Sequence, residues 1–331
     1  MYDVIIIGAG IAGLTAALYS ARQGLKTLVV TTDIGGQLLL TPEIQNYPGF
    51  ISISGYELIR RIEEQVKSYP VEIRFEKVIG VKEDNGVFQV KTSSREYYSK
   101  TVILAFGKTP ERMGIPGEER LVGKGVSYCV ICDAPLFKDK SVALVSMGYR
   151  GVELASLLKK YASKVYWVVP LKSVGVSSEV LKDVLSDKKV ELLINYEPRE
   201  VRGETVVRGL VVENKEDGSL RELKVDGVFV ELGYKTQTEF LKDFVKLNNK
   251  GEVVIDNLCK TSRPGVFAAG DVAELPYKQA IISAGMGATA ALSAYNYILS
   301  LSGKKGKVVY DWKHVKIDKK EKTLFLGFKT R

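Results

Sequence analysis

Residues 2–13 of the chain, YDVIIIGAGIAG, decide the fold. The apolar run Val4–Ile7 reads as a buried strand, and it ends directly in a glycine-rich turn. Residues 14–23 continue as a helix rich in small side chains, and Gly24 supplies a natural stop. Residues 26–31 form a second short apolar run. The pattern predicts a strand–helix–strand unit of about 30 residues, which is the context that a dinucleotide fingerprint requires.

Three glycines of this turn have separate predicted tasks. Gly8 permits the tight turn, Gly10 lets the backbone approach a pyrophosphate, and Gly13 allows close packing of helix on strand. A glycine-rich turn without a ligand is the plainer alternative, but the position between a strand and a helix favours nucleotide binding. The second strand ends Thr31-Thr32-Asp33, where an acid would normally bind the ribose of a nucleotide. Either Asp33 or the threonines do that work.

Residues 140–169 repeat this plan. A strand at 141–145, a turn at Ser146–Gly151, a helix at 152–161 and a strand at 165–169 follow one another. Residues 101–107 and 228–233 also echo each other, each being an apolar strand that ends in glycine. We therefore predict an α/β fold of two Rossmann-like dinucleotide-binding domains, the second inserted in the first. The expected ranges are 1–112 with 245–302 for the first domain, 113–244 for the second, and 303–331 for a basic C-terminal extension.

Composition is that of an ordinary globular protein, with 331 residues, 45% hydrophobic and 26% charged. No apolar run approaches the ~20 residues that would span a bilayer, so we expect no membrane segment. Val4–Ile7 has no basic region before it, which favours a buried strand over a signal peptide. We therefore expect a cytoplasmic location. Three cysteines are too few for a disulfide framework.

The net charge of +9 is concentrated at the end of the chain. Residues 303–331 hold ten Lys/Arg and three Asp/Glu, a net +7, which leaves +2 for the other 302 residues. Because there is no nucleic-acid reading motif, an acidic protein partner is the better expectation than nucleic acid. Two strand-like runs are expected here, at 308–317 and 323–328. Tyr310, Trp312 and His314 would project to one face of the first, either beside a bound cofactor or as part of a structural hairpin.

A Cys-x-x-Cys pair, Cys129 and Cys132, is followed directly by Asp133. In a reducing compartment such a pair is more often redox-active or metal-binding than structural. Half of a zinc site is one alternative, but Cys259 stands alone and the only histidine is His314. We therefore expect no metal, and a buried apolar role for Cys259.

The ordered set of motifs resembles the low-molecular-weight thioredoxin reductase family over residues 2–300. The motifs that carry the resemblance are Gly35-Gly36-Gln37-Leu38, Asn46 to Phe50, Cys129-x-x-Cys132-Asp133, Gly265 to Val272, Gln279-Ala280 and Ser283 to Gly285. The resemblance implies bound FAD, a homodimer and a thioredoxin-like protein partner. It implies that Cys132 faces the flavin, Cys129 is the interchange thiol, and Asp133 is the acid–base group. A dithiol beside a flavin acts as a two-electron relay.

The same resemblance implies a set of FAD-binding residues. Asp271 would bind the ribitol and phosphate region, and the helix beginning near Gln279 would aim its positive end at the flavin's pyrimidine edge. The full set is Gly8, Gly10, Ala12, Gly13, Thr32, Asp33, Gly36, Gln37, Leu38, Asn46, Val78, Ala105, Gly107, Gly270, Asp271, Gln279 and Ala280.

The second nucleotide turn departs from the family pattern. Ser146 replaces the turn glycine, and Tyr149 and Arg150 crowd the pyrophosphate path. The stretch at 167–173 leaves one lysine, Lys172, where the family has a His-Arg-Arg cluster.

We therefore expect weak NADPH binding and a donor such as ferredoxin or another acidic protein. The alternatives are a conventional NADPH-dependent reductase with Lys172 or Arg150 on the phosphate, and a flavin-bound redox sensor without turnover. The domains are expected to rotate about hinges near Met113 and Phe244.

Overall fold

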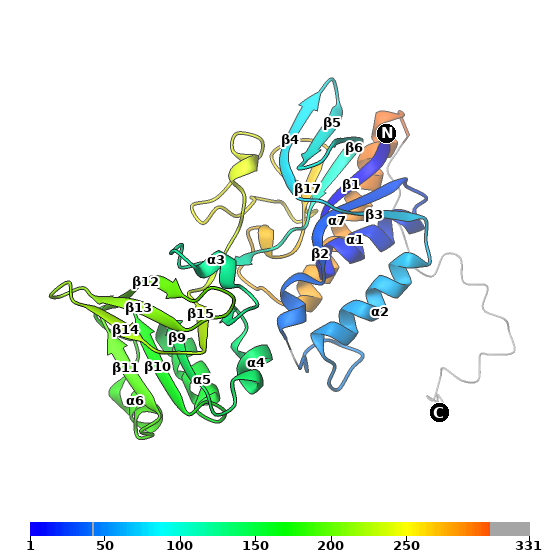
Figure 1. Ribbon diagram of the computed structural model, residues 1–331. Coiled ribbons are helices and arrows are strands. Elements are labelled where there is room, and N and C mark those ends of the chain that lie inside the picture. The colour runs from blue at the N-terminus through cyan, green and yellow to red at the C-terminus, as the bar shows by residue number, and fades with distance from the viewer. Residues whose placement is uncertain (42, 305–331) are drawn as a thin grey trace, which may run out of the picture.

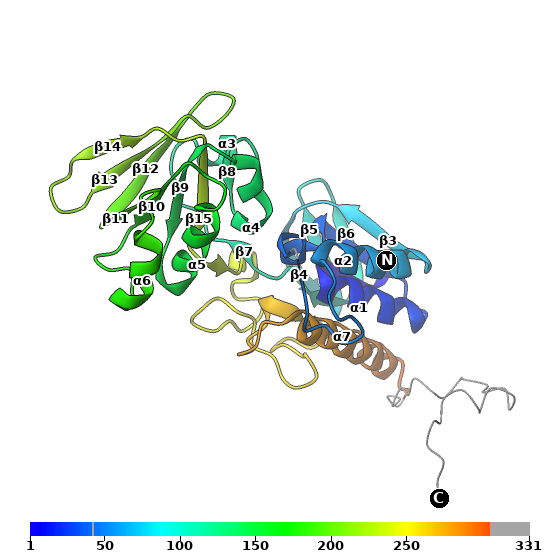
Figure 2. The ribbon, with the colours of Figure 1, turned by 90° about the horizontal axis from the view of Figure 1, so that it is seen from below.

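The structure, a computed structural model, describes residues 1–41 and 43–304. The strand-like runs and aromatic residues predicted at 308–328 lie outside the described residues. Figures 1 and 2 show the chain as two lobes, with the second lobe formed by a continuous middle part of the sequence. None of the helices in the two described ranges is long and apolar enough to cross a membrane.

The first lobe is built on a seven-stranded sheet in the order β3-β2-β1-β6-β5-β4, with β17 also paired to β6. The strands β1, β2, β3, β6 and β17 are parallel, whereas β4 and β5 continue the sheet as an antiparallel meander. The strands are β1 (Tyr2–Ala9), β2 (Thr27–Ile34), β3 (Val71–Phe75), β4 (Val78–Asp84), β5 (Val87–Thr92), β6 (Glu96–Leu104) and β17 (Val266–Ala268).

Small side chains let two helices of this lobe approach closely. Helix α1 (Ile11–Arg22) follows β1 as predicted, and α7 (Ala280–Leu301) packs beside it. A Cβ at Gly287 would lie 2.2 Å from the carbonyl oxygen of Ala12, so glycine is required there. The remaining helical segments of this lobe are α2 (Gly55–Lys67), η1 (Gly36–Leu40), η3 (Glu239–Leu241) and η4 (Gly270–Val272).

The second lobe has a five-stranded parallel sheet in the order β11-β10-β9-β15-β8. One face packs against helices around the buried Trp167, and the other packs against a three-stranded antiparallel sheet. The parallel strands are β8 (Val126–Ser127), β9 (Ser141–Ser146), β10 (Lys164–Val169), β11 (Val190–Ile194) and β15 (Gly227–Glu231). The small sheet holds β12 (Tyr196–Arg202), β13 (Gly209–Asn214) and β14 (Leu220–Leu223), and the helical segments are α3 (Glu118–Leu121), α4 (Val130–Asp133), η2 (Ala134–Phe137), α5 (Gly148–Leu158) and α6 (Ser178–Leu185). The predicted α/β class with two Rossmann-like units is confirmed.

The two segments that join the lobes pair with each other. Strand β7 (Thr109–Pro110) lies antiparallel to β16 (Tyr234–Lys235). Leu241, which the predicted ranges assign to the second domain, is fully buried in the core of the first lobe. The exact domain limits stay a prediction, and this packing favours a return to the first lobe near residue 235 rather than 244.

Candidate active site

A cavity of about 630 Å³ lies where the carboxyl ends of the first sheet's parallel strands face the second lobe. This position is the usual ligand site of an open α/β sheet. All of the predicted cofactor residues except Gly13 and Asn46 line it. Ile131, Arg150, Tyr234 and Gln237 of the middle part of the chain complete the lining. Whether the lining residues bind FAD stays a prediction.

The glycine turn between β1 and α1 has the geometry that its sequence predicts. Gly8 has φ +102°, and a Cβ there would lie 2.6 Å from the carbonyl oxygen of Ala105. A Cβ at Gly13 would lie 1.9 Å from the carbonyl oxygen of Gly8, so Gly13 serves packing rather than the cavity. Gly10, by contrast, has open space at its Cβ position and precedes α1 without a side-chain cap. The turn therefore leaves backbone amides and free space together, as a bound phosphate needs.

The three polar residues at the end of β2, which were predicted to include the ribose contact, have different surroundings. The Thr31 hydroxyl accepts from the Ala9 amide and donates to the Asp33 carbonyl, so it fixes the turn. Asp33 is exposed and lines the cavity, and its carboxylate accepts from the Gly36 amide at 2.9 Å and the Thr32 hydroxyl at 3.2 Å. Thr32 is also exposed and lines the cavity, so the ribose contact of Asp33 or Thr32 stays a prediction.

Residues far apart in the sequence meet at the other side of the cavity. The Gln37 side-chain amide donates to Asp271 at 3.3 Å, and the Asn46 amide donates to Gln279 at 2.6 Å. Helix α7 begins at Ala280 without a side-chain cap, so its positive end faces this cavity. Asn46 therefore acts beside the cavity, by holding Gln279.

An ion-pair cluster under the cavity was missed by sequence reasoning. The buried Glu252 carboxylate accepts from Lys108 at 2.8 Å and from Asn248 at 2.9 Å, and it pairs with Lys278 at 3.1 Å. Burial acts to raise the pKa of Glu252, but these donors outweigh it and hold the pKa at about 2. Both lysines line the cavity. The only signal in the sequence was an acidic residue next to an apolar strand-like run.

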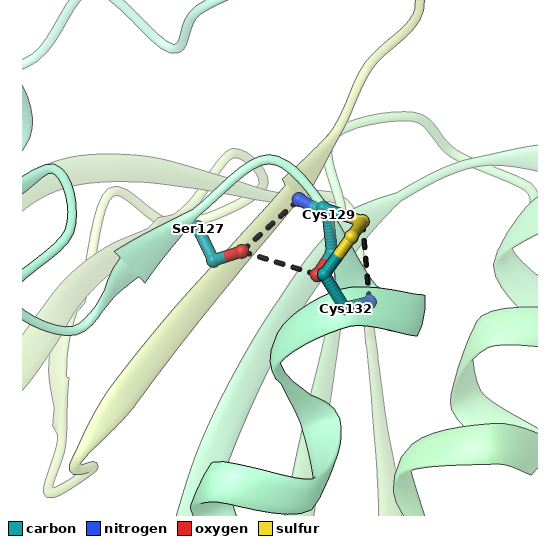
Figure 3. Close-up of a disulfide and its surroundings, with 3 residues drawn as sticks. All are labelled: Ser127, Cys129 and Cys132. Carbon is teal, nitrogen blue, oxygen red and sulfur yellow. Dashed lines mark hydrogen bonds between the residues drawn. A yellow bond between two sulfur atoms is a disulfide. The ribbon is translucent and has the colours of Figure 1, made fainter. Parts of the chain in front are cut away.

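Figure 3 shows the dithiol as a disulfide between Cys129 and Cys132. Cys129 precedes α4, and its sulfur accepts from the Cys132 amide at 3.2 Å. The Ser127 hydroxyl accepts from the Cys129 amide at 3.0 Å and donates to the Cys129 carbonyl at 3.3 Å. A donor aimed at sulfur favours a thiolate over a thiol, so this amide would stabilise a thiolate at Cys129 once the disulfide is reduced.

The exposure of the two cysteine residues differs from what their predicted roles suggest. Cys129 is only 8% exposed, whereas Cys132 is exposed. Helix α4 lies on the side of the second lobe that faces the first (Figures 1 and 2), and Ile131 lines the cavity while neither cysteine does. Asp133 ends α4 and is partly buried. The roles of the three residues stay predictions.

The second nucleotide turn does not repeat the backbone of the first. Gly8 has a positive φ, but Ser146 at the matching position does not, and the positive φ moves to Gly148 (+63°). Ser146 is fully buried, and its hydroxyl has no hydrogen-bond partner among the residues that the structure describes. A Cβ at Gly151 would lie 2.5 Å from the Trp167 ring, so this glycine keeps its packing task.

Two further predictions concern cysteine and metal. Cys259 is buried as expected, and burial raises its pKa to about 11. Within residues 1–41 and 43–304, no three His, Cys, Asp or Glu side chains gather so that they could hold a metal ion.

The fold and the site define a class, which is the two-domain oxidoreductases that couple a nucleotide cofactor to a disulfide. Residues 2–293 match the family model described as pyridine nucleotide-disulphide oxidoreductase, and the chain belongs to that family. The thioredoxin reductase of Aquifex aeolicus is 41% identical over 316 residues, covering 94% of this chain and 97% of that protein. The predicted resemblance to the low-molecular-weight thioredoxin reductases is thereby confirmed. A longer relative, the NADH dehydrogenase of Bacillus subtilis, is 36% identical over 299 residues, which are 90% of this chain and 59% of that protein.

Solved structures agree with this assignment. The crystal structure of Lactococcus lactis thioredoxin reductase (FR conformation) has a TM-score of 0.73 at 31% identity, covering 91% of this chain and 100% of that one. A ferredoxin-flavin thioredoxin reductase from Clostridium acetobutylicum has a TM-score of 0.52 at 32% identity, covering 92% and 99%.

Proposed function

We propose that the protein is an FAD-dependent reductase that passes two electrons through Cys132 and Cys129 to the disulfide of a thioredoxin-like protein. The observation that carries the proposal is that one cavity is lined by the glycine turn, the Gln37–Asp271 pair and the start of α7, and also by Ile131 between the two cysteines. The open space at Gly10 and the uncapped ends of α1 and α7 fit a long anionic cofactor such as FAD.

The chain's own residues account for the thiol chemistry. Bound FAD would supply two electrons, which with two protons convert the Cys129–Cys132 disulfide to a dithiol. The Cys129 thiolate then attacks one sulfur of the partner's disulfide, forming a mixed disulfide and releasing the other sulfur as a thiolate. Cys132 next attacks the Cys129 sulfur, which releases the reduced partner and restores the internal disulfide. Asp133 is the proposed carrier of the protons.

A change in the arrangement of the lobes is part of this proposal. Neither sulfur lines the cavity, and Cys129 is too buried to meet a partner protein as it stands. The paired strands β7 and β16 are the two crossings between the lobes, so a rotation would act there. The predicted hinge at Met113 lies three residues beyond β7, and the one at Phe244 lies against the first core.

The proposed donor is an acidic protein such as ferredoxin rather than tightly bound NADPH. The displaced positive φ in the second turn and the single Lys172 in the stretch at 167–173 argue against tight binding of NADPH. Similarity to a ferredoxin-flavin thioredoxin reductase is a second support.

One observation supports the alternative proposal of a conventional NADPH-dependent reductase. Lys172 and Lys215 together line a hollow of about 420 Å³ at the end of β10, where two ammonium groups could receive a phosphate. A homodimer and a cytoplasmic location stay predictions.

Anaerobic mixing of the FAD-loaded protein with one donor at a time tests the proposal. Reduced ferredoxin should bleach the flavin absorbance, and adding a thioredoxin should restore it. NADPH and NADH should act slowly or only at high concentration. Fast bleaching by micromolar NADPH would favour the conventional reductase, and bleaching without any transfer to thioredoxin would favour a redox sensor.

A further inference from the structure

The second sheet has its own ligand crevice, and its strand order shows where it lies. Strand β9 leads through α5 to β10 on one side, whereas β15 pairs with β9 on the other side. The order therefore reverses between β9 and β15, and a dinucleotide would bind at the carboxyl ends of these two strands. The first sheet has the equivalent crevice between β1 and β6.

The two crevices can be compared position by position, because both strand pairs keep the same register. Ile7 pairs with Leu104 in the first sheet, and Val145 pairs with Val230 in the second. The next residue of β1 is the turn glycine Gly8, and the next residue after Leu104 is Ala105, which lines the cavity. In the second sheet the corresponding pair is Ser146 and Glu231. Glu231 of the second crevice therefore has the position that Ala105 has in the first, with a carboxylate in place of a methyl group.

Glu231 is held at this place with little access to water. Its side chain is 13% exposed, and burial raises the pKa of this carboxyl although Arg150 acts to lower it. Its cation is Arg150, in the first turn of α5, at 3.9 Å from Glu231. The same guanidinium donates to Glu153 at 3.1 Å. One arginine is therefore shared by two carboxylates, of which only Glu231 lies at the β9–β15 reversal.

We infer that Glu231 is a specificity-determining residue that rejects dinucleotides from the second crevice. A pyrophosphate at the β9–β15 reversal would lie against a partly buried carboxylate, and like charges brought together with little water repel strongly. The rejection works through an added repulsive group, which is a common way to exclude a ligand that the fold would otherwise accept.

This inference rests on the proposed use of a donor other than NADPH. Three variants, two at Glu231 and one at Glu153, test the role of Glu231 separately from the proposed donor. Glu231→Ala copies the first crevice, and Glu231→Gln removes the charge while keeping the shape. Glu153→Gln is the matched control, since it frees Arg150 from its other carboxylate on the exposed side of α5 but leaves Glu231 in place. Calorimetric titration of the FAD-loaded full-length proteins with NADPH and with NADH gives the dissociation constants. Flavin content and the unfolding temperature show that each variant is folded.

We expect weak binding by the unchanged chain and at least about tenfold tighter binding by both Glu231 variants, with no gain in Glu153→Gln. Equal binding by the unchanged chain and the Glu231 variants overturns the role of Glu231 alone. A gain in Glu231→Ala without one in Glu231→Gln overturns the charge argument, and an equal gain in Glu153→Gln assigns the effect to overall charge. Micromolar NADPH binding by the unchanged chain refutes both this inference and the proposed donor.

Discussion

Replacing Glu252 with glutamine should destabilise the first lobe, because this carboxylate neutralises two lysines under the cavity. Its side chain is 7% exposed, and its pKa is held at about 2 against an ordinary value of 4.5. A shift of that size corresponds to about 3 kcal/mol at neutral pH, at ~1.4 kcal/mol per pKa unit. We expect a loss of about 2–3 kcal/mol, since the amide can keep one hydrogen bond while Lys108 and Lys278 lose their counter-charge.

The pH dependence of this loss has a definite direction. A carboxylate with a depressed folded-state pKa stabilises the protein fully above its unfolded pKa, and the stabilisation disappears as the pH falls through the folded value. The difference between the parent and Glu252→Gln should therefore be constant near pH 7 and shrink from about pH 4.5 towards pH 2. Urea unfolding of the FAD-loaded proteins, followed by flavin fluorescence at several pH values, measures it.

Glu57 provides the matched control for Glu252. It also pairs with two basic residues, Arg60 and Arg61, and its pKa is likewise lowered to about 2. Its side chain on α2 is 31% exposed, so solvent screens its ion pairs more than those of Glu252, and Glu57→Gln should cost less stability than Glu252→Gln. Equal losses in the two variants would show that burial of Glu252 does not decide the energy, and no loss in Glu252→Gln would refute the reasoning altogether.

Three more outcomes follow from the structure. Cys132→Ser and Cys129→Ser should each abolish thioredoxin reduction while flavin content is unchanged, and a variant as active as the parent would show that the disulfide is structural. Gly8→Ala should lower FAD affinity at least about tenfold, because a Cβ there would lie 2.6 Å from backbone atoms and φ is +102°. Gly24→Ala is the control for backbone strain alone, since φ is positive there but the space around the Cβ position is open. If the basic extension binds the donor, truncation after Gly303 should raise flavin fluorescence and weaken the salt dependence of reduction by ferredoxin. A change in thermal stability alone would show that the extension has a structural role.

The parts of the fold that depend on local sequence could be predicted. The β1 turn, the repeat at β9 and the Cys-x-x-Cys segment each have a spacing that local geometry explains, and the elements lie within a few residues of their expected ranges. The Lys108–Glu252–Lys278 cluster could not be predicted, because its members are up to 170 positions apart and only the folded sheet brings them together. The burial of Leu241 in the first core was missed for the same reason.

The two nucleotide turns show that folding and ligand binding make separate demands on one motif. Gly151 is kept because Trp167 leaves no room for a Cβ, which is a demand of the core and independent of any ligand. Ser146 can replace a turn glycine because φ there is not positive, and the backbone instead makes its unusual turn at Gly148. The sheet, the helix packing and the place of the second unit beside the first cavity therefore do not depend on a bound phosphate. The second unit also fixes the position of α4, and through α4 the position of the dithiol.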